Sequence, residues 1–64
     1  MQYRIDYYLH GKKVADDPPV TFSIEEAVRA ARRGLIRYEA RYARIVDPDK
    51  ADKVVEVIHR DVLP

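Results

Sequence analysis

Six arginines concentrated in one segment are the residues of this sequence most clearly able to bind a ligand. Residues 29–44 hold six arginines and one glutamate, a net charge of +5, while 1–28 and 45–64 carry −2 each and the chain has only +1. The six are Arg29, Arg32, Arg33, Arg37, Arg41 and Arg44. Guanidinium groups bind the phosphates of nucleic acids, so one hypothesis is that this segment forms a nucleic-acid-binding surface. The alternative is that the arginines keep a helix soluble and complement the negative end of its dipole.

Side chains for nucleophilic or acid–base catalysis are scarce. The chain has no cysteine and one serine, Ser23, which is not part of a Gly-x-Ser-x-Gly motif and suits a helix cap. Asp16 and Asp17 form a carboxylate pair, but two prolines follow them, and a solvated loop would keep both carboxylates ionised. Acid–base catalysis requires a carboxylate with a shifted pKa. We therefore expect no catalytic residue and no enzymatic activity.

Ligands for a metal ion or a phosphate group are equally sparse. The two histidines, His10 and His59, are distant in sequence, and neither has a histidine or cysteine beside it. They could meet only if the first and last strands were neighbours. A phosphate-binding loop needs several glycines before a helix, and Gly11 and Gly34 are the only two in the chain. We expect no metal, cofactor or small-molecule site.

The tyrosines point to a second possible function, which is binding to another protein. The chain has five, namely Tyr3, Tyr7, Tyr8, Tyr38 and Tyr42. Tyrosine combines a large apolar ring with a polar end and is enriched at protein interfaces. Rings that stay on the surface, rather than completing a small core, predict docking onto a partner protein or self-association.

The first element that could position these residues is an N-terminal strand. From residue 3 to residue 9, apolar side chains alternate with charged or tyrosine side chains, which is the period of a strand with one buried face. His10-Gly11-Lys12 is a turn signal, and residues 13–15 can return as a short second strand. Asp16-Asp17-Pro18-Pro19 is expected to end that strand and to form an exposed crossover.

A helix is predicted to start after Ser23. Ser23 and Glu26 form a Ser-x-x-Glu capping box, in which each side chain bonds the backbone N–H of the other residue. Gly34 suits the left-handed position after a last turn, which predicts a helix over residues 24–33. A rival interpretation stays open, because apolar residues from Ile24 to Ile45 also fit a heptad seam in a helix that continues past Gly34.

Two C-terminal strands complete the predicted fold. Residues 40–46 alternate as a strand does, Asp47-Pro48-Asp49-Lys50 has turn chemistry, and the β-branched run at 54–58 favours a second strand. This pattern favours helix, strand, turn, strand over one continuous helix. The predicted class is α+β, a single domain over 1–64. Its small antiparallel sheet combines an N-terminal strand or short hairpin with a C-terminal hairpin, and one amphipathic helix packs on one face.

Alternation divides the side chains between a core and an open sheet face. We expect the core to contain Tyr3, Ile5, Tyr7, Leu9, Ile24, Ala27, Val28, Ala31, Leu35, Ala43, Ile45, Val55 and Val57. The opposite face, which has no second helix to cover it, is expected to carry Arg4, Asp6, Tyr8, Tyr42, Arg44, Val46, Glu56 and Ile58. The residues predicted to bind a partner there are Tyr8, Tyr42, Arg44 and Val46.

Several turn and cap signals follow one another along most of the chain. They are Tyr3-Arg4-Ile5-Asp6-Tyr7 with Gly11, Asp16-Asp17, the capping-box segment 23–28 and Arg44-Ile45-Val46-Asp47-Pro48-Asp49. This arrangement resembles that of several small bacterial α+β proteins of unknown function. The resemblance implies the same order of elements and carries no activity with it.

Size and composition bound the function further. A domain of 64 residues buries only about 60% of the surface of its unfolded chain, so a partner chain could add needed stability. Met1-Gln2-Tyr3-Arg4 does not open a signal peptide, and no apolar run approaches the ~18 residues of a membrane span, so we expect a cytoplasmic protein. The expected function is a non-enzymatic module that binds a protein or a second copy of itself through the open sheet face. Nucleic-acid binding by residues 29–44 is the alternative.

Overall fold

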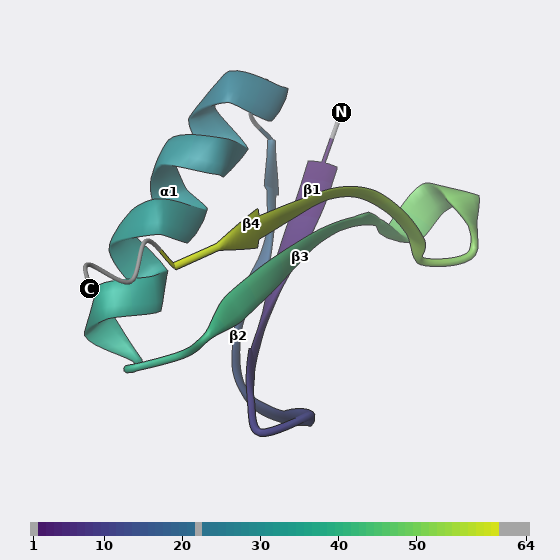
Figure 1. Cartoon of the computed structure of the whole chain (residues 1–64). Helices are drawn as coiled ribbons and strands as arrows, with labels where there is room; N and C mark the ends of the chain where they lie inside the picture. Colours follow the sequence, from purple (N-terminus) through teal and green to yellow (C-terminus); the bar gives the residue numbers. More distant parts are fainter. Residues whose placement is uncertain (1, 22, 61–64) are drawn as a thin grey trace.

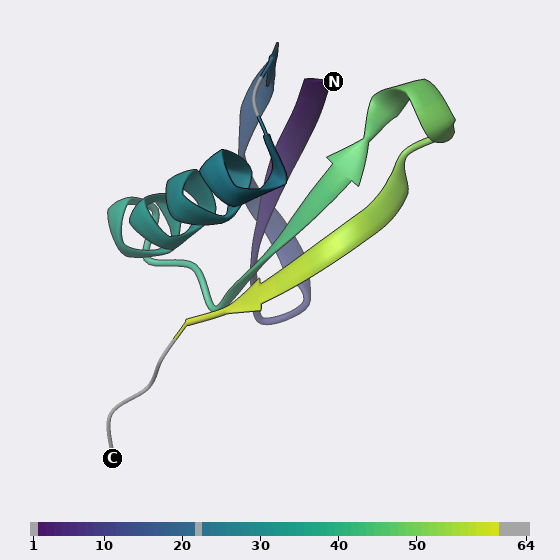
Figure 2. The same cartoon turned by 90° about the horizontal axis from the view of Figure 1, so that it is seen from above.

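In the part of the chain that the structure describes, one α-helix packs on a four-stranded antiparallel sheet (Figure 1). The computed structural model describes residues 2–21 and 23–60, the side chains of 19–21 excepted. The elements are β1 (Gln2–Leu9), β2 (Lys12–Thr21), α1 (Ile24–Arg37), β3 (Tyr42–Asp47), the 3₁₀ turn η1 (Pro48–Lys50) and β4 (Lys53–His59). The strand order is β2-β1-β3-β4, and α1 lies on one side of the sheet, as Figure 2 shows. The predicted α+β class is confirmed, with a hairpin at each end of the chain.

The first turn of α1 has the capping box that the sequence predicts. The Ser23 hydroxyl accepts a hydrogen bond from the Glu26 N–H at 3.2 Å, and the Glu26 carboxylate accepts one from the Ser23 N–H at 3.1 Å. Both bonds satisfy donors that no helical carbonyl can reach. The bond from the Ser23 N–H lowers the pKa of the Glu26 carboxyl group.

Gly34, which was expected to end the helix, lies inside it. The helix runs to Arg37, and Gly34 is buried. A Cβ atom on Gly34 would overlap the hydroxyl oxygen and the ring of Tyr7, so this position needs a glycine for the close approach of α1 to β1. The expected end after residue 33 was wrong. A glycine can serve close packing or a left-handed backbone, and the sequence alone does not distinguish the two.

The C-terminus of α1 has a cap of the predicted kind further along the chain. The left-handed residue is Glu39, with a φ of 54°. The Glu39 N–H bonds the Ile36 carbonyl at 3.2 Å and the Ala40 N–H bonds the Leu35 carbonyl at 2.9 Å, which are the two bonds of a Schellman motif. The chain then enters β3, so the heptad interpretation, with its continuous helix, is excluded.

β2 is longer than the short strand that the sequence predicts. It runs from Lys12 through residues 16–19 to Thr21 and pairs with β1. The prolines are tolerated because β2 is an edge strand, where a missing outward N–H costs no ladder hydrogen bond. The register shifts between Tyr3 and Ile5, beside these prolines. The expectation that Asp16-Asp17-Pro18-Pro19 ends the strand was therefore wrong.

Packing of α1 against β1 and β3 forms the core. Its buried members are Tyr3, Ile5, Tyr7, Ala27, Ala31, Leu35, Ala40, Ala43 and Ile45. Ile24 and Val28 pack against this cluster as partly buried residues. Leu9 was expected in the core but is only half-buried, near the exposed β1–β2 turn. The predicted core is thus confirmed for the helix and, apart from Leu9, for the two central strands.

β4 contributes less to the core than the sequence predicts. Val55 and Val57 were expected there, yet each is 39% exposed. Ile58, which was expected on the open face, packs against the core instead. Ile58 lies opposite Ala43 and Val57 lies opposite Arg44, and residues directly opposite share a sheet face. The alternation of β4 is therefore one residue out of phase with the expectation.

Candidate functional site

The sheet face opposite α1, here called the open face, carries most of the residues predicted to bind a partner. Tyr8 on β1 lies directly opposite Tyr42 on β3, and Asp6 lies opposite Arg44. The open face is defined by Arg4, Asp6, Tyr8, Lys13, Asp16, Tyr42, Arg44, Val57 and His59. Figure 2 shows α1 on the other side of the sheet.

An aromatic row crosses the open face from β1 to β4. The rings of Tyr8 and Tyr42 are stacked, with centroids 5.1 Å apart and planes 7° from parallel. The Arg44 guanidinium lies 4.7 Å from the Tyr8 centroid and 5.8 Å from that of Tyr42. The His59 ring lies 5.9 Å from the Tyr42 ring and is tilted by 41°. These four residues, the aromatic row, hold one another in place, since contacts of this kind contribute roughly 0.5–1.5 kcal/mol each.

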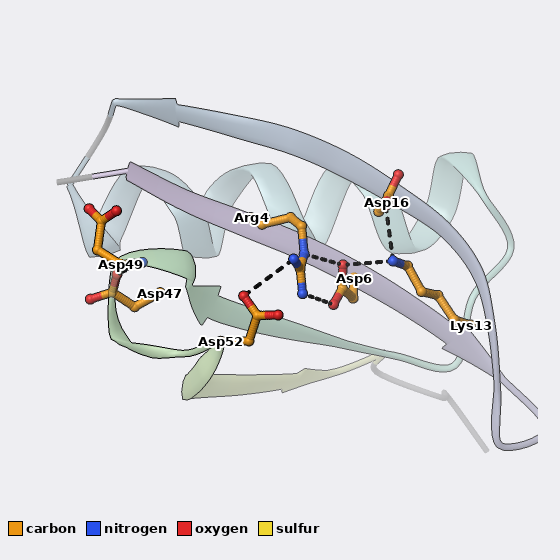
Figure 3. Close-up of polar contacts among 7 residues, drawn as sticks. All are labelled: Arg4, Asp6, Lys13, Asp16, Asp47, Asp49 and Asp52. Carbon is orange, nitrogen blue, oxygen red and sulfur yellow. Dashed lines mark hydrogen bonds and ion pairs between the residues drawn. The ribbon is translucent and has the colours of Figure 1, made fainter.

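A buried carboxylate organises the part of the open face beside the aromatic row (Figure 3). Asp6 is only 4% exposed, and Arg4 donates to both of its oxygens, from Nε at 2.9 Å and from Nη2 at 3.0 Å. Lys13 lies 3.4 Å from the same carboxylate and 3.0 Å from Asp16, while Arg4 also reaches Asp52 at 3.4 Å. Hydrogen bonds from these cations to Asp6 and Asp16 raise the pKa of Arg4 and of Lys13, respectively. The chain thus neutralises a buried acid with two cations, as burial requires.

Charge on the open face is balanced. Its cations are Arg4, Lys13 and Arg44, and the acids beside them are Asp6, Asp16 and Asp52. All three acids take part in the ion pairs of Figure 3. The face therefore lacks the excess of positive charge that attracts a phosphate backbone.

Val46 is the one predicted partner-binding residue that offers little surface. It lies opposite Arg4 on one side and Val54 on the other, yet it is only 3% exposed. Val54 and Val57, in contrast, are 41% and 39% exposed. The apolar area available to a partner at this end of the sheet therefore comes from β4.

Sequence reasoning missed four residues of this surface, which are Lys13, Asp16, Val57 and His59. It placed Asp6 on the face without its role as the carboxylate that two cations share. The His10-Gly11 turn, with φ angles of 53° and 75°, brings Lys13 opposite Tyr8, so pairing the two strands from this turn was a usable signal for Lys13. The phase of β4, which places Val57 and His59 on this face, depends on its pairing with β3 and has no local signal.

The six arginines of the predicted nucleic-acid segment lie on separate surfaces. The solvent side of α1, here called the outer helix face, carries Arg29, Arg32, Arg33 and Arg37. Arg41 is exposed between α1 and β3, and Arg44 is on the open face in the aromatic row. Within residues 2–21 and 23–60, no acidic side chain forms an ion pair with an arginine of the outer helix face.

A second polar cluster lies on the helix side of the sheet. The Tyr7 hydroxyl donates to Asp17 at 2.6 Å, and the Tyr38 hydroxyl donates to the other oxygen of Asp17 at 3.0 Å. Burial raises the pKa of Tyr7, and the hydrogen bond to Asp17 raises that of Tyr38. A raised pKa keeps a phenol protonated, which is the opposite of what activates a nucleophile. This cluster ties β2 to the C-terminal part of α1.

Histidines and acidic residues do not gather into a metal site in the part of the chain that the structure describes. No group of three His, Cys, Asp or Glu residues there could hold a metal ion. β3 separates β1 from β4, so His10 and His59 are not on neighbouring strands. Among the described residues, no helix is both long and apolar enough to cross a membrane.

No family model matches this chain, and neither a curated protein nor a solved structure matches it. The open face and the outer helix face are the two surfaces whose chemistry bears on function. They differ in charge, in aromatic content and in side of the sheet.

Proposed function

We propose that this protein is a non-enzymatic interaction module whose open face binds a second protein chain, either another protein or a second copy. The observation that carries the proposal is the aromatic row on the side of the sheet opposite α1. Its tyrosines, Tyr8 and Tyr42, are only half-buried although they are large, and the exposed Val57 adjoins Arg44 in the register. A core of aromatic and apolar side chains with a charged rim is typical of protein interfaces.

The geometry of the aromatic row suits a protein better than a nucleic acid. Bases bind by stacking on free ring faces. Here Tyr8 and Tyr42 stack on each other, while Arg44 and His59 contact the same rings. The acids beside the row also neutralise its neighbouring cations, so the face has no excess of positive charge to attract phosphates. A protein partner needs only the exposed parts of the two half-buried tyrosines and the neighbouring apolar area, which includes Val57, 39% exposed.

Substitution of the row tests the proposal. Tyr42→Ala removes ring area and Tyr8→Asp places a charge in it, and both variants should stay folded because neither side chain is fully buried. Truncation of an interface tyrosine commonly costs more than ~1.4 kcal/mol, which is about tenfold in affinity. We therefore expect partner proteins crosslinked in a lysate, quantified by mass spectrometry, to fall about tenfold for each variant.

The matched control is Val14→Asp, which changes another exposed apolar residue, 48% exposed on β2, outside the aromatic row. It should retain the partners of the parent protein. Equal recovery by the parent, Tyr42→Ala and Tyr8→Asp would reject the open face as the binding surface. So would an unchanged mass across a dilution series together with no crosslinked partner.

The outer helix face supports nucleic-acid binding as a second candidate function. Arg29, Arg33 and Arg37 recur every four residues on one side of α1 and lack acidic ion-pair partners among the described residues. Such a stripe attracts phosphates, with an affinity that falls by roughly 0.7–0.9 log units per log unit of salt for each phosphate neutralised.

Fluorescence anisotropy with short single- and double-stranded oligonucleotides tests this second candidate. Arg33→Glu should reduce the salt slope, whereas Arg44→Ala, on the other side of the sheet, should leave it unchanged. Binding that does not depend on salt, or no binding at low salt, would reject it.

A further inference from the structure

The two edges of the sheet are protected to different degrees. On β2, residues 18–19 are prolines and the pairing with β1 shifts register twice, features that discourage pairing with a further strand. On β4, residues 53–59 contain no proline, and the pairing with β3 shifts register once, between Ile45 and Val46. Val54, Val55 and Val57 on this strand are 39–41% exposed. β4 lies along the outer side of the sheet in Figure 2, and no other described strand pairs with that side. An exposed apolar edge of this kind is a template for another strand.

Two backbone hydrogen bonds show which groups of β4 face outward. The Arg60 N–H donates to the Arg41 carbonyl at 2.9 Å, and the Arg41 N–H donates to the Tyr8 carbonyl at 2.7 Å. Residue 60 therefore directs its N–H toward the central strands, and backbone groups alternate in direction along an antiparallel strand. The N–H and C=O groups of Val57 and His59 consequently point away from β3, to the free edge.

We propose that β4 pairs antiparallel with β4 of a second copy of this chain, in the register that places Val57 opposite His59. In this register the outward N–H and C=O groups of both residues bond across a two-fold axis. Ile58 lies on that axis, opposite the same residue of the second copy. Glu56 then lies opposite Arg60 of the second copy, and symmetry makes this ion pair twice.

Charge selects this register among those that the backbone allows. The pairing of β4 with β3 is regular from Glu56 onward and shifts register at Val55. Outward groups must face outward groups, so within the regular part Val57 lies opposite residue 57 or 59 of the second copy. Opposite residue 57, Glu56 would face Ile58. Within the described residues, only the pairing of Val57 with His59 brings Glu56 to an opposite charge.

A basic groove beside the end of β4 has room for the incoming glutamate. The groove has a volume of about 330 Å³ and is lined by Arg32, Leu35, Ile36, His59 and Arg60. None of these five residues is acidic, so two guanidinium groups share the groove without a carboxylate from its described lining. Glu56 of the second copy would approach the groove at Arg60, which makes the two charges complementary across the edge.

The pairing would join two four-stranded sheets into one continuous sheet, with both aromatic rows on the same face. It does not depend on the open face binding anything, because the backbone edge and the aromatic row are different surfaces. The paired segment covers residues 56–60 of each chain, which is small for a protein interface, so the dimer should be weak and dependent on concentration.

Amide hydrogen exchange of three neighbouring residues tests the pairing directly. The Ile58 amide points to β3 and should be protected at every protein concentration, which makes it an internal control. The Val57 and His59 amides should exchange freely in dilute protein and about tenfold more slowly near ~1 mM, where a weak dimer forms. The same result in Tyr42→Ala would show that the edge pairs without the aromatic row.

Variants in which the charges of Glu56 and Arg60 are reversed test the register, with dimerisation measured by sedimentation equilibrium. Glu56→Arg and Arg60→Glu each replace two opposite-charge pairs by like-charge pairs, and each should weaken the dimer about tenfold. The double variant restores both pairs and should recover the parent dimer, while Lys53→Glu, a control on the same strand outside the paired segment, should have no such effect. If a single variant does not fold, the dimerisation of the double variant and the amide hydrogen exchange of the parent protein still test the proposed pairing.

Three results would overturn the proposal. They are a monomer up to ~1 mM, a dimer that neither single charge change affects, and Val57 and His59 exchange that does not vary with concentration. A dimer abolished by Tyr42→Ala but unaffected by the edge variants would reject edge pairing and assign self-association to the open face.

Discussion

The open face and the outer helix face both carry arginines, yet the two surfaces treat them differently. On the open face each cation has a partner, since Arg4 and Lys13 contact Asp6 and Arg44 lies over Tyr8. On the outer helix face four arginines stand together without an acidic ion-pair partner among the described residues. The open face is therefore a neutral, organised surface suited to a protein, and the outer helix face is an exposed positive stripe.

We infer from this difference that the partners of the arginines on each surface matter more for binding than the number of arginines in the segment. A segment with a net charge of +5 in the sequence is divided by the fold between the two sides of the sheet. The arginine that joins the open face loses its availability to phosphate because it packs on tyrosine rings. Among the described residues, Arg37 is the one arginine of the outer helix face that lies over a ring, 5.6 Å from the Tyr38 centroid, and Arg29, Arg32 and Arg33 remain available to phosphate.

Gly34→Ala should have the largest effect, because it disturbs the contact that holds α1 on the side of the sheet away from the open face. A Cβ atom at this position overlaps Tyr7, whose ring is fully buried, so neither partner can move freely. Overpacking of this kind costs typically 1–3 kcal/mol and outweighs the gain of ~1 kcal/mol in helix propensity. Urea unfolding measures the change, with Arg33→Ala as the control on the exposed side of the same turn. A net gain in stability would contradict the packing role of Gly34.

Asp6→Asn should come next, since it removes the negative charge at the centre of the open face. The side chain of Asp6 is 6% exposed, and the change leaves Arg4 and Lys13 without their shared carboxylate. Loss of a buried charge-assisted pair costs roughly 1–3 kcal/mol. The matched control is Asp16→Asn, whose side chain is 50% exposed and whose ion pair should contribute less than ~1 kcal/mol. Equal losses of unfolding free energy in the two variants would show that burial of Asp6 does not matter.

The order of elements and the open face were predictable from local patterns. The Ser23–Glu26 capping box, the turn at His10-Gly11 and the alternation of β1 each specify their element from a few neighbouring residues. These signals placed Tyr8, Tyr42 and Arg44 on one face because β1 and β3 both alternate regularly.

What could not be predicted depends on contacts between distant residues. Gly34 is a glycine because of Tyr7, which is far away in sequence. The phase of β4 is set by its pairing with β3, and a shift of one residue exchanges Val57 with Ile58 between the two faces. The prolines of β2 are compatible with a strand only because that strand is at the edge.

Alkaline pH should weaken the polar cluster that ties β2 to the helix side. Burial and the hydrogen bond to Asp17 raise the pKa of Tyr7 above its ordinary value of 10.0. Above pH ~10 the unfolded chain therefore loses a proton that the folded chain keeps, so stability that is fully present below this pH falls as pH rises, by up to ~1.4 kcal/mol per pH unit. Tyr7→Phe should be less stable at neutral pH and show a flatter decline above pH ~10 in urea unfolding. The same decline in both proteins would mean that Tyr7 is not the group responsible.

The smallest predicted effect provides the sharpest test of the contrast between the two faces. Replacing an arginine by glutamate should stabilise the protein on the outer helix face and destabilise it on the open face. Arg33→Glu turns two like-charge pairs on α1, with Arg29 and with Arg37, into opposite-charge pairs, and should stabilise the protein by about 0.5 kcal/mol at low salt. The gain should disappear near ~1 M salt, where exposed charges are screened. Arg44→Glu should instead destabilise by about 1 kcal/mol, since it removes the cation from Tyr8 and places an acid opposite Asp6. The part of this destabilisation that comes from lost packing should persist at ~1 M salt. If both variants changed stability in the same direction, the arginines of the two faces would be equivalent, and the separation of a charge-balanced open face from a positive helix face would fail.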